Sequence, residues 1–120
     1  MLRVGNLDAA RDFLDVRDVC AAYVGCLRQA EAVLGEGVVN VASGTPRRLQ
    51  DVMAELLALA GIAPTIEPDL ARMRPSEIPR SCGDATRARR LLGWSPTVPW
   101  PLTLRDVLEH WRGRLGGCKP

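Results

Sequence analysis

Several residue types that catalytic and metal sites depend on are scarce in this sequence. Among 120 residues there is one lysine, one histidine, one tyrosine and one phenylalanine. The four cysteines form no Cys-x-x-Cys pair, and a single histidine completes none of the usual zinc-ligand patterns. We therefore expect no metal site, and free thiols in a reducing cytoplasm. The cysteines are Cys20, Cys26, Cys82 and Cys118.

The sequence also lacks a long apolar run and a strong net charge. Apolar stretches such as residues 54–60 are too short to span a bilayer, and the amino terminus has no apolar signal core. A net charge of +2 is too small to indicate a nucleic-acid partner. With 47% hydrophobic and 25% charged residues, the composition predicts one globular domain over residues 1–120, without membrane contact and in the cytoplasm.

A third absence concerns cofactor chemistry. No Gly-x-Gly-x-x-Gly or Gly-x-x-Gly-x-x-Gly run is present to cradle a dinucleotide pyrophosphate at a helix start. Gly35 and Gly37 lack a third glycine and precede an apolar run typical of a strand. We therefore expect no complete Rossmann domain and no cofactor held by this chain.

The hydrophobic pattern predicts helices alternating with a few short strands, which is an α/β, helix-rich class with a small sheet. Extended runs are expected at 2–5, 11–14, 38–42 and 64–68, and helices at 16–34, 46–60, 85–92 and 104–115. The predicted helix caps are Asp15, Thr45, Asp84 and Thr103. Residues 69–83 carry two prolines and are expected to form an irregular binding loop.

Several stretches follow one another in the order seen in a known family. They are VGNLDAARDFLDVRDV at 4–19, GVVNVASG at 37–44, RPSEIP at 74–79, GD at 83–84, LLGWSP at 91–96 and TLRDVLEHW at 103–111. Together they resemble the carboxyl-terminal, substrate-binding part of extended short-chain dehydrogenase/reductases of the NAD-dependent epimerase/dehydratase type. The resemblance is greatest to the GDP-mannose 4,6-dehydratase and GDP-6-deoxy-mannose reductase group.

The resemblance implies a binding site for a nucleotide-diphosphate sugar of the GDP-mannose type. Arg11 and Arg74 would approach the diphosphate, Glu77 would hold the ribose hydroxyls, and Asn6 would lie by the base. The chemistry fits, because planar guanidinium groups bind phosphates and an ionised carboxylate accepts from a diol.

Structural interpretations of the same residues stay open. The chain has an overall arginine bias, which the codon usage of a GC-rich genome would explain. Arg11 could pair with Asp12 or Asp15, and Arg74 with Glu77 could be an exposed ion pair of little energetic weight. Asn6 follows a glycine, which is also an ordinary turn signal.

The family's catalysis needs a tyrosine followed four residues later by a lysine. Here Tyr23 is followed by Leu27 at that spacing, and Lys119 lies in the tail. We therefore expect no catalytic residues and no enzyme activity from this chain alone, whereas full-length family members use NAD(P). His110, one helical turn after Asp106, is expected to be part of a solvated pair.

The same reasoning predicts self-association. In a full-length relative, part of this region packs on the cofactor domain, so in this chain apolar surface would face water. We expect a homodimer, through the first helix or an exposed sheet edge. Two functions are compatible with this: a nucleotide-sugar-binding fragment, or an oligomeric assembly protein that keeps the fold without the ligand.

Overall fold

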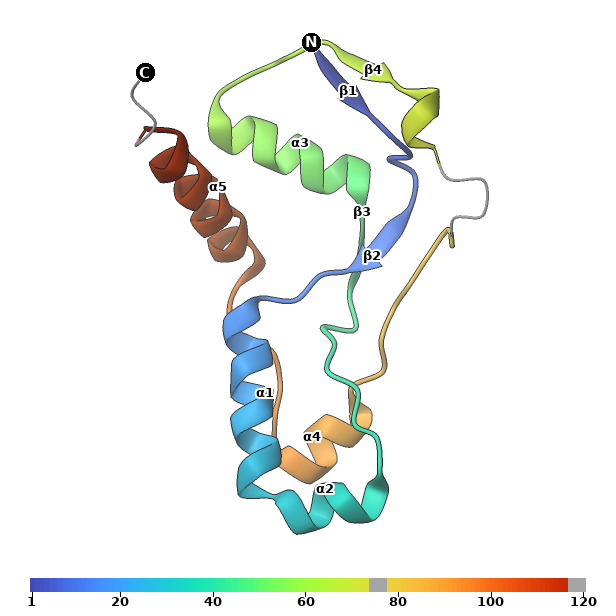
Figure 1. Ribbon diagram of the computed structural model, residues 1–120, viewed down its shortest axis with the longest axis vertical. Coiled ribbons are helices and arrows are strands. Elements are labelled where there is room, and N and C mark those ends of the chain that lie inside the picture. Colours follow the sequence, from blue (N-terminus) through green and yellow to red (C-terminus); the bar gives the residue numbers. More distant parts are fainter. Residues whose placement is uncertain (74–77, 117–120) are drawn as a thin grey trace. The chain divides into compact units, whose positions relative to one another are not determined.

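The computed structural model describes residues 1–73 and 78–116, which form helices and short strands (Figure 1). The chain divides into two compact units. The first unit comprises Met1–Ala9, Arg48–Pro79 and Pro99–Pro120, and the second comprises Ala10–Arg47 and Arg80–Val98. The elements are β1 Leu2–Val4, β2 Ala10–Asp12, α1 Val16–Arg28, α2 Ala30–Glu36, β3 Pro46–Arg48, α3 Leu49–Ala60, β4 Ile66–Pro68, the 3₁₀ turn Leu70–Arg72, α4 Thr86–Leu92 and α5 Trp100–Gly116.

The first unit combines a two-stranded parallel sheet with two helices. β1 pairs with β4, with Leu2 opposite Ile66 and Val4 opposite Pro68. α3 packs on α5, and the Trp100 indole N–H donates to the Glu55 carboxylate across this pair at 2.7 Å. Gly5 is needed where the chain leaves β1, because a Cβ there would lie 2.8 Å from the Arg72 carbonyl oxygen.

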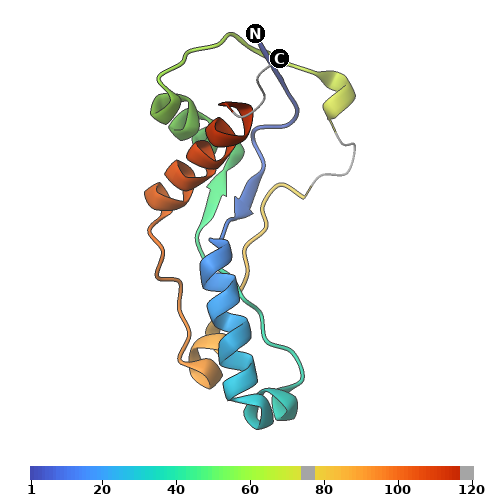
Figure 2. The ribbon, with the colours of Figure 1, turned by 60° about the vertical axis from the view of Figure 1, so that its left-hand side comes forward.

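The second unit has a core made mostly of small side chains. Its buried apolar residues are Ala22, Ala42, Ala85, Ala88 and Trp94. α1 and α4 lie side by side in this unit, as the views of Figures 1 and 2 agree. Alanine-rich contacts let the backbones approach closely, but they remove little apolar area from water, so other interactions must contribute to stability.

Buried hydrogen bonds around Asp18 supply part of that contribution. The Asp18 side chain is 2% exposed, and its carboxylate accepts from the Thr97 N–H and hydroxyl at 2.9 Å each and from the Val98 N–H at 3.1 Å. The Trp94 indole N–H donates to the Asp18 carbonyl oxygen at 2.9 Å. These bonds attach the segment after α4 to the first turn of α1.

The predicted helix-rich class with a small sheet is confirmed, but several of its elements differ. The expected helix over 16–34 is two helices, because Gln29 leaves the helical conformation at φ −116° and ψ 35°. No proline or glycine stands at position 29 to signal this break.

The strand expected at 38–42 is the second difference. Side chains alternate between buried and exposed positions as in a strand, since Val39 and Val41 pack against the core while Val38 and Asn40 are exposed. However, within residues 1–73 and 78–116 no hydrogen bond joins the backbone of Val39–Ala42 to another strand. A strand pattern without a partner remains an extended segment.

Two predicted helix starts were also wrong. Thr45 and Pro46 do not begin α3; Pro46 opens β3, and α3 begins at Leu49, whose N–H donates to the Ala9 carbonyl at 2.9 Å. α5 begins at Trp100 rather than after Thr103, since the Pro99 carbonyl accepts from the Leu102 N–H at 2.9 Å.

Two aspartates were predicted to cap helices, and both accept a backbone hydrogen bond at a helix start. Asp15 caps α1 as predicted, accepting from the Arg17 N–H at 2.9 Å. Asp84 lies one residue before the α4 cap and accepts from the Thr86 N–H at 2.8 Å.

In the part of the chain that the structure describes, no helix has the length and apolar character of a membrane span. The prediction of a single domain over 1–120 stays a prediction.

We predict that Asp18→Ala lowers the free energy of unfolding by about 2–3 kcal/mol, because the donors on Thr97 and Val98 lose their buried acceptor. Chemical denaturation followed by circular dichroism would measure this change. Asp8→Ala serves as the control, because the exposed Asp8–Arg48 ion pair contributes about 0–1 kcal/mol. Equal losses in the two variants would contradict the role given to Asp18.

Candidate functional site

The carboxylate of Asp12, the last residue of β2, joins three segments of the second unit. One oxygen accepts from the Ser43 N–H at 3.0 Å and from the Ser43 hydroxyl. The other accepts from the Gly44 N–H and the Gly83 N–H, both at 3.0 Å. The residue after the candidate phosphate ligand Arg11 is therefore held by four donors.

The charge state of Asp12 follows from these contacts. Burial, the largest single influence, would raise its pKa, but the bonds from the Ser43 hydroxyl and from the N–H groups of Gly83, Gly44 and Ser43 together outweigh it. The pKa of Asp12 is consequently lowered, and the group is ionised near neutral pH.

Glycines are required at two of the donor positions. Gly44 has φ +75°, in the left-handed region that side chains with a Cβ rarely adopt. A Cβ on Gly83 would overlap the Cβ of Ala42, so only glycine brings this N–H to Asp12 without displacing the core.

Arg11, the first predicted diphosphate ligand, lies in the middle of β2. Its guanidinium Nη1 donates to the Ala10 carbonyl at 2.8 Å, and its side chain is half-buried. Of the two carboxylates considered as its partners, Asp12 accepts the bonds described above. Asp15 accepts from the Arg17 guanidinium at 2.9 and 2.8 Å.

Asn6, the predicted base contact, forms a turn between β1 and β2. Its side-chain oxygen accepts from the Asp8 N–H at 2.9 Å, which is the Asx-turn geometry of the structural interpretation. Asn6 belongs to the first unit and Arg11 to the second. Arg74 and Glu77 lie outside the described residues, so the structure does not test whether the four predicted ligands converge.

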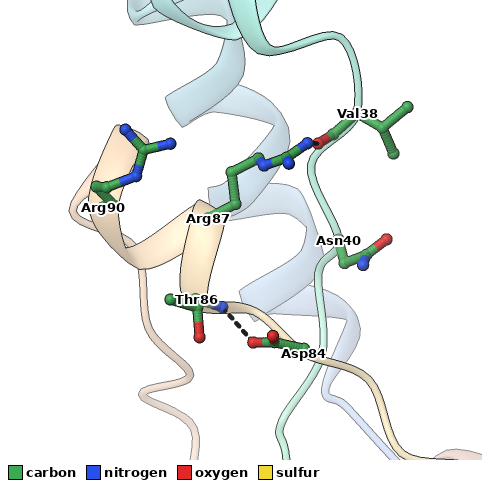
Figure 3. Close-up of a pocket in the computed structure, with 6 residues that line it drawn as sticks. All are labelled: Val38, Asn40, Asp84, Thr86, Arg87 and Arg90. Atoms are coloured by element: carbon green, nitrogen blue, oxygen red, sulfur yellow. Dashed lines mark hydrogen bonds between the residues drawn. The ribbon is translucent and has the colours of Figure 1, made fainter.

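A pocket of about 380 Å³ lies elsewhere in the second unit (Figure 3). Its lining residues are Val38, Asn40, Asp84, Thr86, Arg87 and Arg90. Arg87 reaches across to the Val38 carbonyl and donates at 2.7 Å, while Asp84 is bound to Thr86 (Figure 3). Hydrogen bonds from the Thr86 hydroxyl and N–H lower the pKa of Asp84, so an ionised carboxylate lines the same pocket as the two arginines. This mixed charge makes the pocket a poorer diphosphate site than a pair of arginines alone.

The sequence analysis does not predict that Asp12 organises this region; it names Asp12 only as a possible partner for Arg11. The donors to Asp12 lie in two of the motifs that carry the family resemblance, Ser43 and Gly44 in one and Gly83 in the other. The signal in the sequence that could have predicted this arrangement is an aspartate in one motif and a glycine turn in each of two others.

The fold and its motifs define the carboxyl-terminal part of an extended short-chain dehydrogenase/reductase. The chain belongs to the GDP-mannose 4,6 dehydratase family, whose model matches residues 1–107. This match runs through both the Arg11 and the Arg74–Glu77 motifs.

Individual relatives agree with this membership. The chain is 37% identical over 114 residues to GDP-6-deoxy-D-mannose reductase of Pseudomonas aeruginosa, covering 95% of this chain and 36% of the relative. It is 30% identical over 110 residues to UDP-glucose 4-epimerase of Mycolicibacterium smegmatis, covering 92% of this chain and 34% of the relative. The structure of RMD from Pseudomonas aeruginosa complexed with NADPH superposes with a TM-score of 0.81 at 33% identity, covering 94% of this chain and 36% of that one. The chain thus spans about a third of the length of these relatives.

We predict that Asp12→Asn makes stability less dependent on pH. Because the pKa of Asp12 is lower in the folded state, its contribution is present above the unfolded pKa of about 4 and is lost as the pH falls through the folded value. Urea unfolding at pH 7 and pH 3 should therefore show a smaller difference for Asp12→Asn than for the wild type. Ser43→Ala, which removes one donor, should be intermediate. An unchanged difference in Asp12→Asn would contradict the assignment.

Proposed function

We propose that this chain is the part of a sugar-nucleotide dehydratase or reductase that grips the substrate, and that its ligand is a nucleotide-diphosphate sugar of the GDP-mannose type. Arg11 and Arg74 bind the diphosphate, Glu77 accepts from the ribose hydroxyls, and Asn6 lies near the base. The observation that carries the proposal is the family match through both arginine motifs.

The surroundings of Arg11 support its role. A diphosphate ligand is bound best by a cation whose backbone does not have to be ordered on binding. Arg11 stands on β2 next to Asp12, whose four hydrogen bonds fix the end of this strand. The ordering of this backbone is therefore complete before any ligand arrives.

The base preference rests on the relatives. The relative at 37% identity is named for a GDP-linked sugar, and the one at 30% is named for UDP-glucose. Together with the family model, this favours a guanine over a uracil nucleotide as the ligand.

The residues of this chain do not fit the nicotinamide cofactor of the family. Gly35 lies inside α2 and Gly37 ends it, so neither forms a turn that leads into a helix and cradles phosphates. Tyr23 is exposed on α1, with Leu27 where the family's lysine would stand. We therefore propose no hydride-transfer step for this chain alone, and we propose that NAD(P) would be held by the part of a family protein that this chain does not span.

The test is a titration of the 120-residue chain with GDP and with GDP-mannose, each up to millimolar concentration, in which ligand-observed NMR measures binding. Binding is expected to be weak, because the sugar end of the ligand lacks the enclosure of a second domain. Arg74→Ala and Arg11→Ala should each weaken binding about tenfold or more, since a charge-assisted hydrogen bond contributes about 1.5–3 kcal/mol.

Arg105→Ala is the matched control. It removes the same charge from an exposed position on α5, where Arg105 lies 3.8 Å from Asp106. If all three variants weakened nucleotide binding equally, the loss would be explained by the lower net charge of the chain and not by contacts at Arg11 and Arg74. No binding of either nucleotide by the wild type at millimolar concentration would reject the proposal.

A second candidate function is assembly without ligand binding. It is favoured by the many large apolar side chains exposed on the described residues, among them Leu27 and Leu34 at 80% each. Under this alternative, the oligomer would form while neither nucleotide bound to it.

A further inference from the structure

Ser81 lies beside Arg11, the residue that we propose binds the diphosphate. The Ala10 carbonyl oxygen accepts from the Ser81 N–H at 3.0 Å and from the Arg11 guanidinium Nη1 at 2.8 Å. Because one oxygen accepts from both groups, the guanidinium of Arg11 and the backbone of Ser81 are neighbours. Both residues belong to the second unit, so their relative position is described within one compact body.

The pairing of the two segments places the side chains of Arg11 and Ser81 on the same face. Ala10 forms a parallel bridge with Arg80. Neighbouring strands lie about 5 Å apart, and successive side chains along a strand point to opposite faces. Arg11 and Ser81, each one residue further along, therefore project together from the face opposite to that of Ala10 and Arg80.

The backbone around Ser81 is attached to β2 at two points. The Ser81 N–H is bound to the Ala10 carbonyl, and two residues later the Gly83 N–H donates to the Asp12 carboxylate at 3.0 Å. A ligand that contacted Ser81 would therefore not have to order this backbone on binding, which removes part of the entropic cost of association.

The Ser81 hydroxyl has no hydrogen-bond partner within residues 1–73 and 78–116, and the residue is exposed. The hydroxyl of Ser43, in contrast, donates to Asp12. A serine hydroxyl supplies one donor, and its hydrogen bond is stronger when the acceptor is ionised, as a phosphate oxygen is. The Ser81 hydroxyl is therefore suited to an anionic ligand that Arg11 also contacts.

The negative charge of Asp12 does not oppose an anion on this face. Asp12 follows Arg11 on β2, so its side chain points to the opposite face of the strand. Its carboxylate accepts from the N–H groups of Ser43, Gly44 and Gly83, which stabilise its charge. The carboxylate is therefore bound on one face of β2, while Arg11 projects from the other.

We infer that Ser81 is a further residue of the diphosphate site, and that its hydroxyl donates a hydrogen bond to an oxygen of the phosphate group that Arg11 binds. A second donor matches a group that carries more than one acceptor oxygen. This inference rests on the proposed function, because it adds a residue to the site that contains Arg11.

Strand pairing, and not motif resemblance, points to this residue. Ser81 lies between the RPSEIP motif at 74–79 and the GD motif at 83–84 and belongs to neither. Its place beside Arg11 follows only from the bridge between Ala10 and Arg80 and from the bond that its N–H donates.

Two variants that differ only in the hydroxyl test the inference, by titration of the 120-residue chain with GDP and ligand-observed NMR. Ser81→Thr keeps the hydroxyl, and Ser81→Val has the same branched shape without it. Ser81→Thr should bind GDP like the wild type, whereas Ser81→Val should bind about tenfold more weakly, because a hydrogen bond to a charged group is lost. Both substitutions suit an extended backbone, and circular dichroism would establish that each variant is folded.

Ser95→Ala is the control, since Ser95 is an exposed serine in the segment after α4, and its loss should leave the affinity unchanged. Equal affinities of Ser81→Val and Ser81→Thr would overturn the inference. Those affinities would be equal if the hydroxyl contributed nothing, and also if both variants were weakened by the shape of the new side chain.

Failure of this inference can be told apart from failure of the proposed function. GDP binding that Arg11→Ala weakens, but that is the same in Ser81→Val and Ser81→Thr, would overturn the role of Ser81 alone. A folded wild-type chain that binds neither GDP nor GDP-mannose at millimolar concentration would overturn both.

Discussion

The second unit depends on one carboxylate that joins three segments distant in sequence. Asp12 on β2 accepts hydrogen bonds from Ser43, Gly44 and Gly83, so strand, turn and the approach to α4 meet at one ionised group. These hydrogen bonds lower the pKa of Asp12 by more than burial raises it. The carboxylate therefore stays ionised and remains a strong acceptor. Without Asp12, three backbone N–H groups would lose their partners together.

Such hydrogen bonds contribute much of the stability of the second unit, because its core buries little apolar area. Among the described residues, the buried members of the second unit's core are four alanines and Trp94, with the partly buried Leu14, Val39, Val41 and Leu92 packed against them. Trp94 is itself tied by a hydrogen bond to the Asp18 backbone, and the Asp18 carboxylate binds the segment after it. Directional bonds therefore hold elements whose side chains bury little area.

The chain spans about a third of the length of its relatives, so it represents one part of the family's architecture. Exposed apolar side chains on α1, such as Val16 and Leu27, belong to this part. We propose that the diphosphate grip at Arg11 and Arg74 is one side of a larger enclosure.

Sequence by itself determined the class of fold, the helix start at Val16, the Asp15 cap, the start of β1, the end of α4 and membership of the family. These features follow from local periodicity, turn chemistry and motif order. Tertiary structure alone decided that Val39–Ala42 stays extended, with no strand beside it among the described residues, and that Pro46 enters a strand. It also decided that Asp12 collects donors from two distant motifs. The physical reason is that strand pairing and carboxylate bonding are satisfied across the fold, by partners whose identity no local pattern encodes.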